Sequence, residues 1–309
     1  MGQDAASERH HCRNTNVAGN ASRQTMTTRL LRFILAFVTC LSCSKPTPND
    51  KSTEVISFPY FKQSFDWTSI EKSINDTDKR RLTDSIPWLS SMYPDTVYLP
   101  SVHSFDFNAD GLNDFIYSGP GPIDDWTTII GINYSNEVKY FSLDGRVIDI
   151  RLKDKRVSNI FTISVVATSP AMEGHRAINV DYKDGLPIFN TIFESEKVDW
   201  TPLPNDKQSI SYEFESLNDT IILRDSPVEL DTPYNYFLEV NGNQFGKIIK
   251  GTKGQVIGQL TDSLKNAWLC VLIYPNHEII DYPLYPNGKF DSTDRVNKVV
   301  WIRNKGIKR

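Results

Sequence analysis

The residues with the most specific chemistry lie between positions 106 and 114, which read Asp-Phe-Asn-Ala-Asp-Gly-Leu-Asn-Asp. The first, third, fifth and ninth positions carry Asp or Asn, and the sixth is Gly, where a tight loop must turn. Calcium is a hard cation that takes about six to eight oxygen ligands. We therefore expect a calcium loop, with side-chain oxygens from Asp106, Asn108 and Asp110, the carbonyl of Leu112, and Asp114 closing the shell.

This loop is not a typical EF-hand, because the closing Glu at the twelfth position is replaced by Tyr117 and both flanks look like strands. It resembles the Asp-rich loops of FG-GAP and VCBS-type repeats, found in integrin propeller blades and bacterial surface proteins. Those families repeat the loop once per blade, whereas it occurs once here, so the resemblance predicts no propeller. The alternative is a turn whose Asp and Asn side chains bond their own backbone. Nearby Asp124 and Asp125 are further candidate ligands.

The second chemical signal is Cys43, which follows a short apolar run from Phe33 to Leu41 with Arg29 and Arg32 before it. The run is too short to span a bilayer, which needs about 20 residues, and reads as a secretory signal. Leu41-Ser42-Cys43 resembles a bacterial lipobox. That resemblance implies lipidation of Cys43 and a membrane anchor in a bacterial envelope, with the outer membrane as the expected location.

Two details of this segment remain open. Cys40 stands where the lipobox prefers Leu and is a rival acceptor, and an uncleaved apolar anchor is the alternative to lipidation. Residues 1–25 are polar and unusual before a signal peptide, so we expect Met26 to be the true start. Residues 1–43 then form the signal segment, and 44–52 a flexible tether.

No enzyme motif is present in the sequence. His103, His175 and His277 lack metal-binding spacing, no nucleophile elbow occurs, and Cys270 lies in an apolar run, which predicts an inert buried thiol. Glu173 and His175 are expected to share a loop with Gly174 and could meet a carboxylate in the fold, although a polar histidine in a loop is usually solvated. Without the signal segment the chain has 29 basic and 36 acidic side chains, a net charge of −7 that argues against nucleic acid as a partner.

These groups are expected to be carried mainly by strands. Aromatic, Ile and Val residues are frequent, and turn signals separate short apolar runs. Two helices are predicted, one from the spacing of Trp67, Ile70 and Ile74 and one from Leu82, Ile86 and Leu89. Strands are predicted at 55–58, 96–99, 114–118, 127–133, 138–142, 147–152, 160–168, 177–181 and 188–193, and then at 209–214, 220–223, 236–240, 246–250, 255–260, 268–274 and 299–302. The fold class is mainly β, with an antiparallel domain covered by one or two helices at 53–205 and a small barrel at 206–309.

The barrel is predicted from a resemblance between residues 246–302 and the bacterial SH3-like domain. The resembling stretches are Gly251 to Leu260, Trp268 to Leu272, and Val300-Trp301-Ile302. Val300 departs from the family, which has Gly there, and the insertion from Asn276 to Asn297 is longer than usual. The resemblance implies a module that binds a cell-wall peptide, a glycan or a protein.

Aromatic residues of this module are the candidate ligand-binding groove: Tyr274, Tyr282, Tyr285, Trp301 and, as a weaker candidate, Trp268. Trp268 heads an apolar run, so we expect it to pack in the core instead. Taken together, the sequence predicts a non-enzymatic, lipid-anchored envelope binding protein that is calcium-stabilised. The alternatives are an envelope hydrolase whose residues converge only in the fold, and a structural spacer without a ligand.

Overall fold

The computed structural model describes residues 64–309 apart from 123–124, 135, 167–170, 206, 236–239 and 282–295. The contacts divide the chain into two units, Met1–Ser52 and Thr53–Arg309, and all described residues belong to the second. Several predictions therefore lie outside the described residues: those on Met26, Cys40, Cys43, the tether, the strand at 55–58, Asp124, Tyr282, Tyr285 and most of the strand at 236–240.

Short helical elements come first, and their ends follow from local chemistry. They are η1 (Trp67–Ser69), α1 (Asp76–Thr83), α2 (Pro87–Met92), α3 (Asp95–Tyr98) and η2 (Leu99–Ser101). Asn75 caps α1, because its side-chain oxygen accepts a hydrogen bond from the Asp78 amide at 2.9 Å. Pro87 occupies the first position of α2, where its missing N–H costs nothing.

Two of the predicted elements in this region are wrong. The expected helix from Trp67 to Ile74 is only the single turn η1, after which residues 71–75 form neither helix nor strand. The expected strand at 96–99 is helix α3, although Val97 and Tyr98 favour strands. Pro94 precedes α3 in extended conformation and sets its start, and Tyr98 is buried in a core cluster with residues such as Leu89 and Tyr117.

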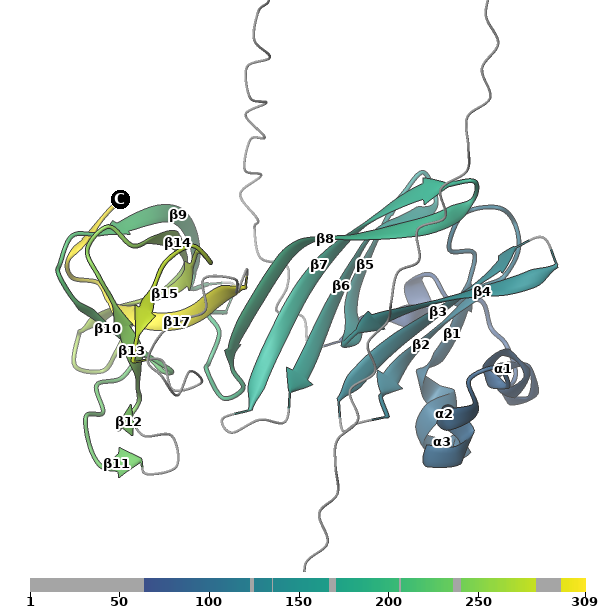
Figure 1. Cartoon of the computed structure of the whole chain (residues 1–309), viewed down its shortest axis with the longest axis horizontal. Coiled ribbons are helices and arrows are strands. Elements are labelled where there is room, and N and C mark those ends of the chain that lie inside the picture. The colour runs from purple at the N-terminus through teal and green to yellow at the C-terminus, as the bar shows by residue number, and fades with distance from the viewer. Residues whose placement is uncertain are drawn as a thin grey trace, which may run out of the picture. The chain divides into compact units, whose positions relative to one another are not determined.

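The first sheet is antiparallel, with the order β1-β2-β3-β4, and its strands alternate between two buried faces. The strands are β1 (Val102–Phe105), β2 (Asp114–Pro120), β3 (Trp126–Tyr134) and β4 (Glu137–Asp144). In β2, Phe115 and Tyr117 pack with residues of the helices, such as Leu89. Ile116, between them, packs on the opposite face in a different core cluster. The predicted helix cover is thus confirmed, on one face of this sheet (Figure 1).

A larger sheet contains most of the remaining strands. They are β5 (Arg146–Lys153), β6 (Arg156–Val166), β7 (Met172–Lys183), β8 (Leu186–Val198), β9 (Ser209–Ser216), β10 (Ile221–Arg224), β13 (Gln244–Ile248), β14 (Lys253–Thr261), β15 (Ala267–Ile273), β16 (Ile279–Ile280), β17 (Asn297–Arg303) and β18 (Ile307–Lys308). Its main order is β18-β9-β14-β15-β17-β8-β7-β6-β5, while β11 (Tyr234–Asn235) and β12 (Val240–Asn241) form a separate pair. The mainly-β prediction is confirmed.

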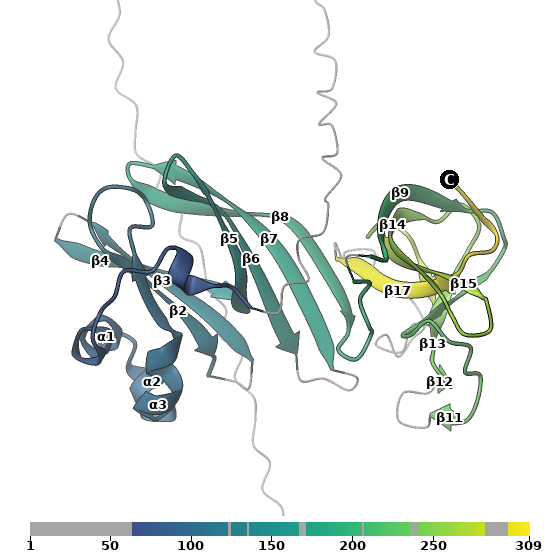
Figure 2. The ribbon, with the colours of Figure 1, turned by 180° about the vertical axis from the view of Figure 1, so that it is seen from behind.

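The far face of the first sheet packs onto β5–β7. Phe105, Phe107 and Ile130 share a core cluster with Val157 and Val180 of the larger sheet. The front and back views show β1–β4 between the helices and strands β5–β8 (Figures 1 and 2). Residues of this region therefore form three layers, and the loop at 106–114 emerges where β1 meets β2.

The strands after residue 206 wrap around a second core. Phe214, Leu223, Phe245, Val256 and Val271 lie in it, all nearly inaccessible to solvent. Figure 1 shows β9, β14, β15, β17, β10 and β13 curled together, as in a small barrel. Among the described residues, no strand pairing joins the β18-β9 end to the β13-β16 end. The likeness to an SH3-like domain stays a prediction.

The predicted boundary at 205 lies within a continuous sheet and core. β17 pairs in parallel with β8, through Asn297 opposite Ser195 and Lys298 opposite Glu196. One core cluster contains Phe161 and Phe193 from one side of the boundary and Trp268, Cys270 and Trp301 from the other. Because the apolar surfaces of the two parts are buried against each other, we expect them to unfold together.

His103 in β1 provides a test of how this core responds to pH. Its ring is 8% exposed and stacks on Trp67, with ring centroids 3.8 Å apart. Burial lowers the pKa of His103 to about 3, and the charge of Lys79 adds to this. The carboxylate of Glu71, whose Oε1 lies 3.4 Å from Nδ1, favours the charged ring and opposes this shift. Because the ring is nearly inaccessible to solvent, burial outweighs Glu71 and the pKa stays lowered.

Acidification is therefore expected to destabilise the fold through His103. In the unfolded chain the pKa is about 6.5, so stability present above that pH is lost as the pH falls toward 3. Between pH 7 and pH 5 the loss is at most about 2 kcal/mol. Urea unfolding of His103→Gln at both pH values should show a smaller pH dependence than the native chain. An unchanged difference between the two pH values would contradict this account.

Candidate functional site

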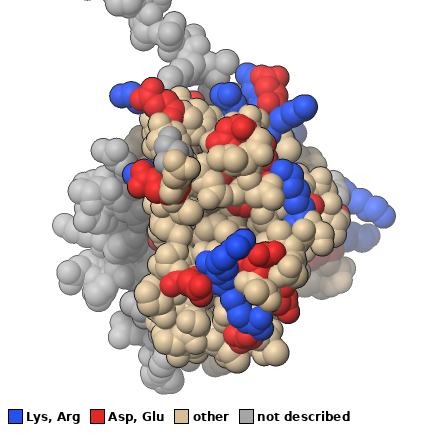
Figure 3. All heavy atoms as spheres, turned by 90° about the vertical axis from the view of Figure 1, so that its right-hand side faces the viewer, with Lys and Arg blue, Asp and Glu red and all other residues tan. Residues whose placement is uncertain are grey.

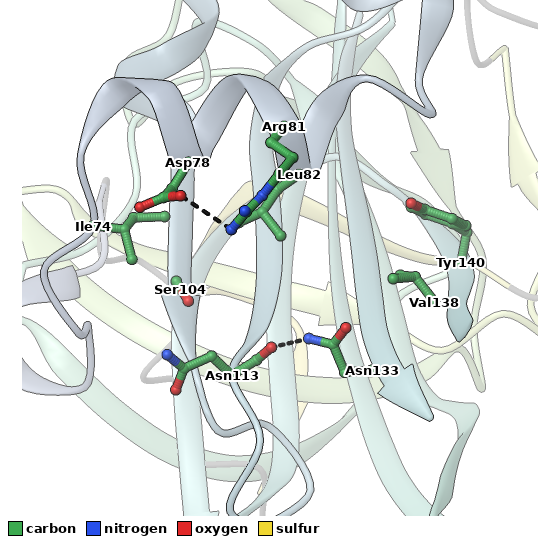
Figure 4. A pocket seen from close by; sticks show the side chains of 9 residues that line it. All are labelled: Ile74, Asp78, Arg81, Leu82, Ser104, Asn113, Asn133, Val138 and Tyr140. Carbon is green, nitrogen blue, oxygen red and sulfur yellow. Dashed lines mark hydrogen bonds and ion pairs between the residues drawn. The ribbon is translucent and has the colours of Figure 1, made fainter. Parts of the chain in front are cut away.

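A hollow of about 430 Å³ lies between helix α1 and the edge of the first sheet. Its walls come from four places in the chain: the start and face of α1, strand β1, the end of the loop before β2, and the facing positions of β3 and β4 (Figure 4). The lining residues are Ile74, Asp78, Arg81, Leu82, Ser104, Asn113, Asn133, Val138 and Tyr140. We call this the polar hollow.

The polar groups of this hollow are only partly bonded to one another. Arg81 donates to Asp78 Oδ1 at 3.0 Å, and its side chain is 76% exposed. Asp78 Oδ2 accepts from Asn75 at 3.0 Å, so both carboxylate oxygens of Asp78 are engaged. A guanidinium group has five N–H donors, and most of those of Arg81 face solvent.

Two amide side chains form the opposite wall. Asn133 donates through Nδ2 to the carbonyl oxygen of Asn113. Asn113 Oδ1 accepts from Lys72 Nζ at 2.7 Å, which places a second positive charge beside the hollow. The side-chain Nδ2 of Asn113 and the side-chain Oδ1 of Asn133 are left to bond a ligand, so this wall presents both a donor and an acceptor (Figure 4).

No sequence motif predicted the residues that line the hollow, and only Asn113 lies within a motif that the sequence revealed. Arg81, Asn133 and Tyr140 come from three separate elements and share no spacing that a motif search could recognise. Asn113 alone lies within the predicted calcium loop. That adjacency was the only signal that linked the loop to a binding surface.

The loop itself is held by its own acidic side chains. The Asp106 carboxylate accepts hydrogen bonds from the amides of Asp110, at 3.1 Å, and Gly111, at 3.0 Å. Asp110 Oδ1 accepts from the Leu112 amide at 2.8 Å. Ala109 and Gly111 have φ angles of 60° and 89°, which curl the chain so that these side chains lie on one side.

Asn108 connects the loop to the rest of the fold. Its side chain is 3% exposed and donates to Gly185 O at 3.0 Å, in the turn between β7 and β8. It also donates to Asp110 Oδ2 at 2.9 Å, and its Oδ1 accepts from the Asp110 amide at 3.2 Å. The loop is thus shaped before any ligand arrives.

Asp114, which was predicted to close the calcium shell, is engaged by two backbone amides. It is 1% exposed, and its two oxygens accept from the Phe107 amide, at 2.9 Å, and the Asn133 amide, at 2.8 Å. Burial raises the pKa of Asp114 to about 6, and the neighbouring charges of Asp110 and Asp106 add to this. Here Asp114 ties the loop to β3, so its role as a ligand stays a prediction.

The other predicted ligands fit calcium better. Each carboxylate oxygen of Asp106 and Asp110 accepts a single hydrogen bond and keeps a lone pair for a hard cation. Leu112 is 50% exposed and its carbonyl belongs to the same turn. Over the described part of the chain, no group of three or more His, Cys, Asp or Glu side chains is arranged to hold a metal ion. A site here would therefore depend on amide and backbone oxygens as well.

The predicted aromatic groove of the C-terminal part needs correction. Trp301 is 1% exposed and donates through Nε1 to Pro202 O at 2.7 Å, so it packs in the shared core and cannot line an open groove. Trp268 is fully buried, as expected, and bonds Asp262 at 2.9 Å. Tyr274 packs against the same core, with its hydroxyl 3.4 Å from Glu213 Oε1. Both faces of β17 are buried, Val300 and Ile302 in one core cluster and Val299 and Trp301 in another, which leaves Trp301 no open face.

Glu173 and His175 also lie elsewhere than predicted. They belong to strand β7 rather than to a loop, and His175 is 4% exposed. His175 Nε2 lies 2.7 Å from Glu173 Oε1, and Lys197 Nζ lies 3.0 Å from the same oxygen. Although burial opposes it, these two partners lower the pKa of Glu173. A histidine–carboxylate pair of the kind a hydrolase uses is present, with the side chain of His175 5% exposed and that of Glu173 15% exposed.

Cys270 is fully buried, and burial raises the pKa of its thiol well above the ordinary range, as an inert cysteine requires. No helix among the described residues is long and apolar enough to cross a membrane. Comparison of the chain with protein-family models, with curated proteins and with solved structures finds no match in any of the three.

Proposed function

We propose that this chain is a lipid-anchored protein of a bacterial cell envelope that binds a cell-wall or protein ligand without catalysis. The observation that carries the binding part of the proposal is the polar hollow, and the anchor is supported by the lipobox-like Leu41-Ser42-Cys43. Its volume of about 430 Å³ falls in the usual range for ligand pockets, about 300 to 1,000 Å³. It also has convergent polar groups on an otherwise apolar frame, formed by Ile74, Leu82 and Val138.

Calcium is proposed to stiffen the wall of this hollow. Asp106, Asn108, Asp110 and the Leu112 carbonyl would hold the ion, which neutralises the repulsion between the two carboxylates. The chain runs directly from this loop into Asn113, whose amide lines the hollow. Fixing the loop therefore fixes Asn113, which supports a structural role for the metal rather than a chemical one.

The membrane anchor is tested by lipid labelling. Cells that express the chain would be fed an alkyne-tagged palmitate, and the tag would be detected on the purified protein. Cys43→Ala is expected to abolish the label, while Cys40→Ala, three residues away, should retain it. A label lost only in Cys40→Ala would move the anchor to that residue. N-terminal sequencing of the unprocessed precursor checks the start at Met26.

Binding in the hollow is tested by filling it. The full-length chain would be screened by thermal shift against soluble cell-wall fragments, and Val138→Trp is expected to abolish any stabilisation. Leu264→Trp is the control, since Leu264 is 79% exposed and lies outside the hollow. Stabilisation that persists in Val138→Trp would rule out this hollow as the binding site.

A hydrolase remains the second candidate, favoured by the Glu173–His175 pair. Its support is limited, because Ser195, directly opposite His175 in the sheet, is only 1% exposed and no substrate reaches it in this arrangement. Incubation of the chain with cell-wall polymer should release no soluble products. Product release that His175→Asn abolishes would favour the hydrolase instead.

A further inference from the structure

A second hollow, of about 410 Å³, lies beside the first. It is lined by Ser85, Ile86, Trp88, Pro122, Thr127, Ile129, Tyr140, Phe141 and Ser142, and is mostly apolar. We call it the apolar hollow. Tyr140 lines both hollows, so they are neighbours on the same side of the sheet.

The strand register shows that the two hollows lie in line. On β4 the helix-facing residues are Val138, Tyr140 and Ser142, and opposite them on β3 stand Asn133, Gly131 and Ile129. Asn133 belongs to the polar hollow and Ile129 to the apolar one. Four residues of extended strand span about 13 Å, so the two hollows together extend over about that length of β3 and β4, and we call this line the groove.

The middle of the groove is shallow rather than blocked by the sheet. The ring of Phe115 covers Gly131 and occupies the place of a Cβ, so this ring forms the floor of the middle. Tyr140 crosses the middle of the groove: its hydroxyl forms a hydrogen bond with that of Ser85, and its ring packs edge-on against Phe115 with centroids 6.0 Å apart. Tyr140 is 42% exposed. The hydrogen bond between Tyr140 and Ser85 is exposed and contributes little free energy, so polar groups of a ligand can replace it.

The two ends call for different chemistry. The polar end presents the open donors of Arg81, with Lys72 close by and Asp78 already saturated, so it favours a carboxylate. Basic and acidic side chains are interleaved over this side of the molecule, so selectivity rests on individual groups rather than on a field of one sign (Figure 3). The apolar end offers Ile86, Trp88 and Ile129, whose apolar surface favours the burial of an apolar side chain.

We propose that the groove binds a short extended peptide, with an apolar side chain in the apolar hollow and a carboxylate at Arg81. The span of about 13 Å matches four extended residues. At the polar end, in the same hollow as Arg81, the side-chain amides of Asn113 and Asn133 offer a donor and an acceptor to a peptide group. This inference rests on the proposed binding function and names its ligand class.

The probes are acetylated tetrapeptides X-Ala-Ala-Ala, with Leu, Phe or Val as X, titrated by calorimetry into the full-length chain. Each is compared with its C-terminal amide and with a version that has Gly as X. We expect the free acid to bind about tenfold more tightly than the amide, as a charge-assisted hydrogen bond predicts. Replacing X by Gly should also weaken binding about tenfold. Both comparisons change only the peptide, so they do not depend on whether a protein variant folds.

Arg81→Ala should remove the difference between acid and amide. Arg80→Ala is the matched control, because Arg80 precedes it on α1 but pairs with Asp95 and does not line the groove. Equal binding of acid and amide, or no binding by any of the peptides, overturns the inference. A different outcome is that no peptide binds but a four-sugar chitin fragment does, and that Val138→Trp abolishes this binding. That result overturns the peptide as the ligand class, while the proposed binding function stands.

Discussion

Calcium added to the chelator-treated chain is expected to raise its midpoint of thermal unfolding by about 5 to 10 °C at a hundredfold excess over the dissociation constant. A ligand that binds only the folded state then contributes about 2.7 kcal/mol, and a chain of this size shifts by about 2 to 4 °C per kcal/mol. Asp106, Asn108 and Asp110 already face one another, so little of this energy is spent on ordering the loop. Magnesium should act far less, because it demands a tighter octahedral shell.

The quantity to compare between variants is the rise in the unfolding midpoint that calcium causes. Asp110→Ala also removes the bonds to Leu112 and Asn108, so it lowers the midpoint even in chelator. The increment itself should vanish in Asp110→Ala and persist in Asp84→Ala, an exposed acid outside the loop. If millimolar calcium leaves the native midpoint unchanged, residues 106–114 are an Asp-rich turn and nothing more.

Trp301→Ala is expected to lower the free energy of unfolding by about 3 to 5 kcal/mol, the largest effect of any substitution considered. The side chain is 1% exposed and packs with Phe193 and Trp268, from opposite sides of residue 205. Trp301→Phe keeps most of the apolar contact and loses the bond to Pro202 O. Because Pro202 is exposed and water can replace that bond, we expect a smaller loss of about 1 to 2 kcal/mol.

The same substitution tests whether the two parts unfold as one. Chemical unfolding would be followed by far-ultraviolet circular dichroism and by tryptophan fluorescence in the native chain and in Trp301→Ala. We expect a single transition in both, displaced to lower denaturant in the variant. Two separated transitions, with only the later strands affected, would restore the independent barrel predicted from the sequence.

The sequence predicted the strand-rich fold because alternation and turn signals are local. Asn75 and Pro87 likewise set helix ends through their immediate neighbours. The strand expected at 96–99 failed because Pro94 starts a helical turn whose burial outweighs the propensity of Val97 and Tyr98. Local patterns therefore predict where an element begins more reliably than whether it is a helix or a strand, because tertiary packing decides the latter.

The candidate site was less accessible to prediction, for a physical reason. The oxygens of residues 106–110 were foreseeable because they act on their own loop. The bond from the Asn133 amide to Asp114 depends on the β2–β3 register, and the groove depends on Arg81 and Tyr140 meeting across two elements. Such partners are fixed by packing, so no spacing along the chain records them.

The parallel pairing of β8 with β17 also has a kinetic consequence. Lys298 bonds Glu196 across a separation of 102 residues. Contacts so distant along the chain must overcome the entropy of closing a long loop before they gain any burial, and proteins dominated by them fold slowly. We therefore expect β1–β8 to collapse before β17 arrives, leaving Phe161 and Phe193 exposed in an intermediate that is prone to aggregate until the last strands dock.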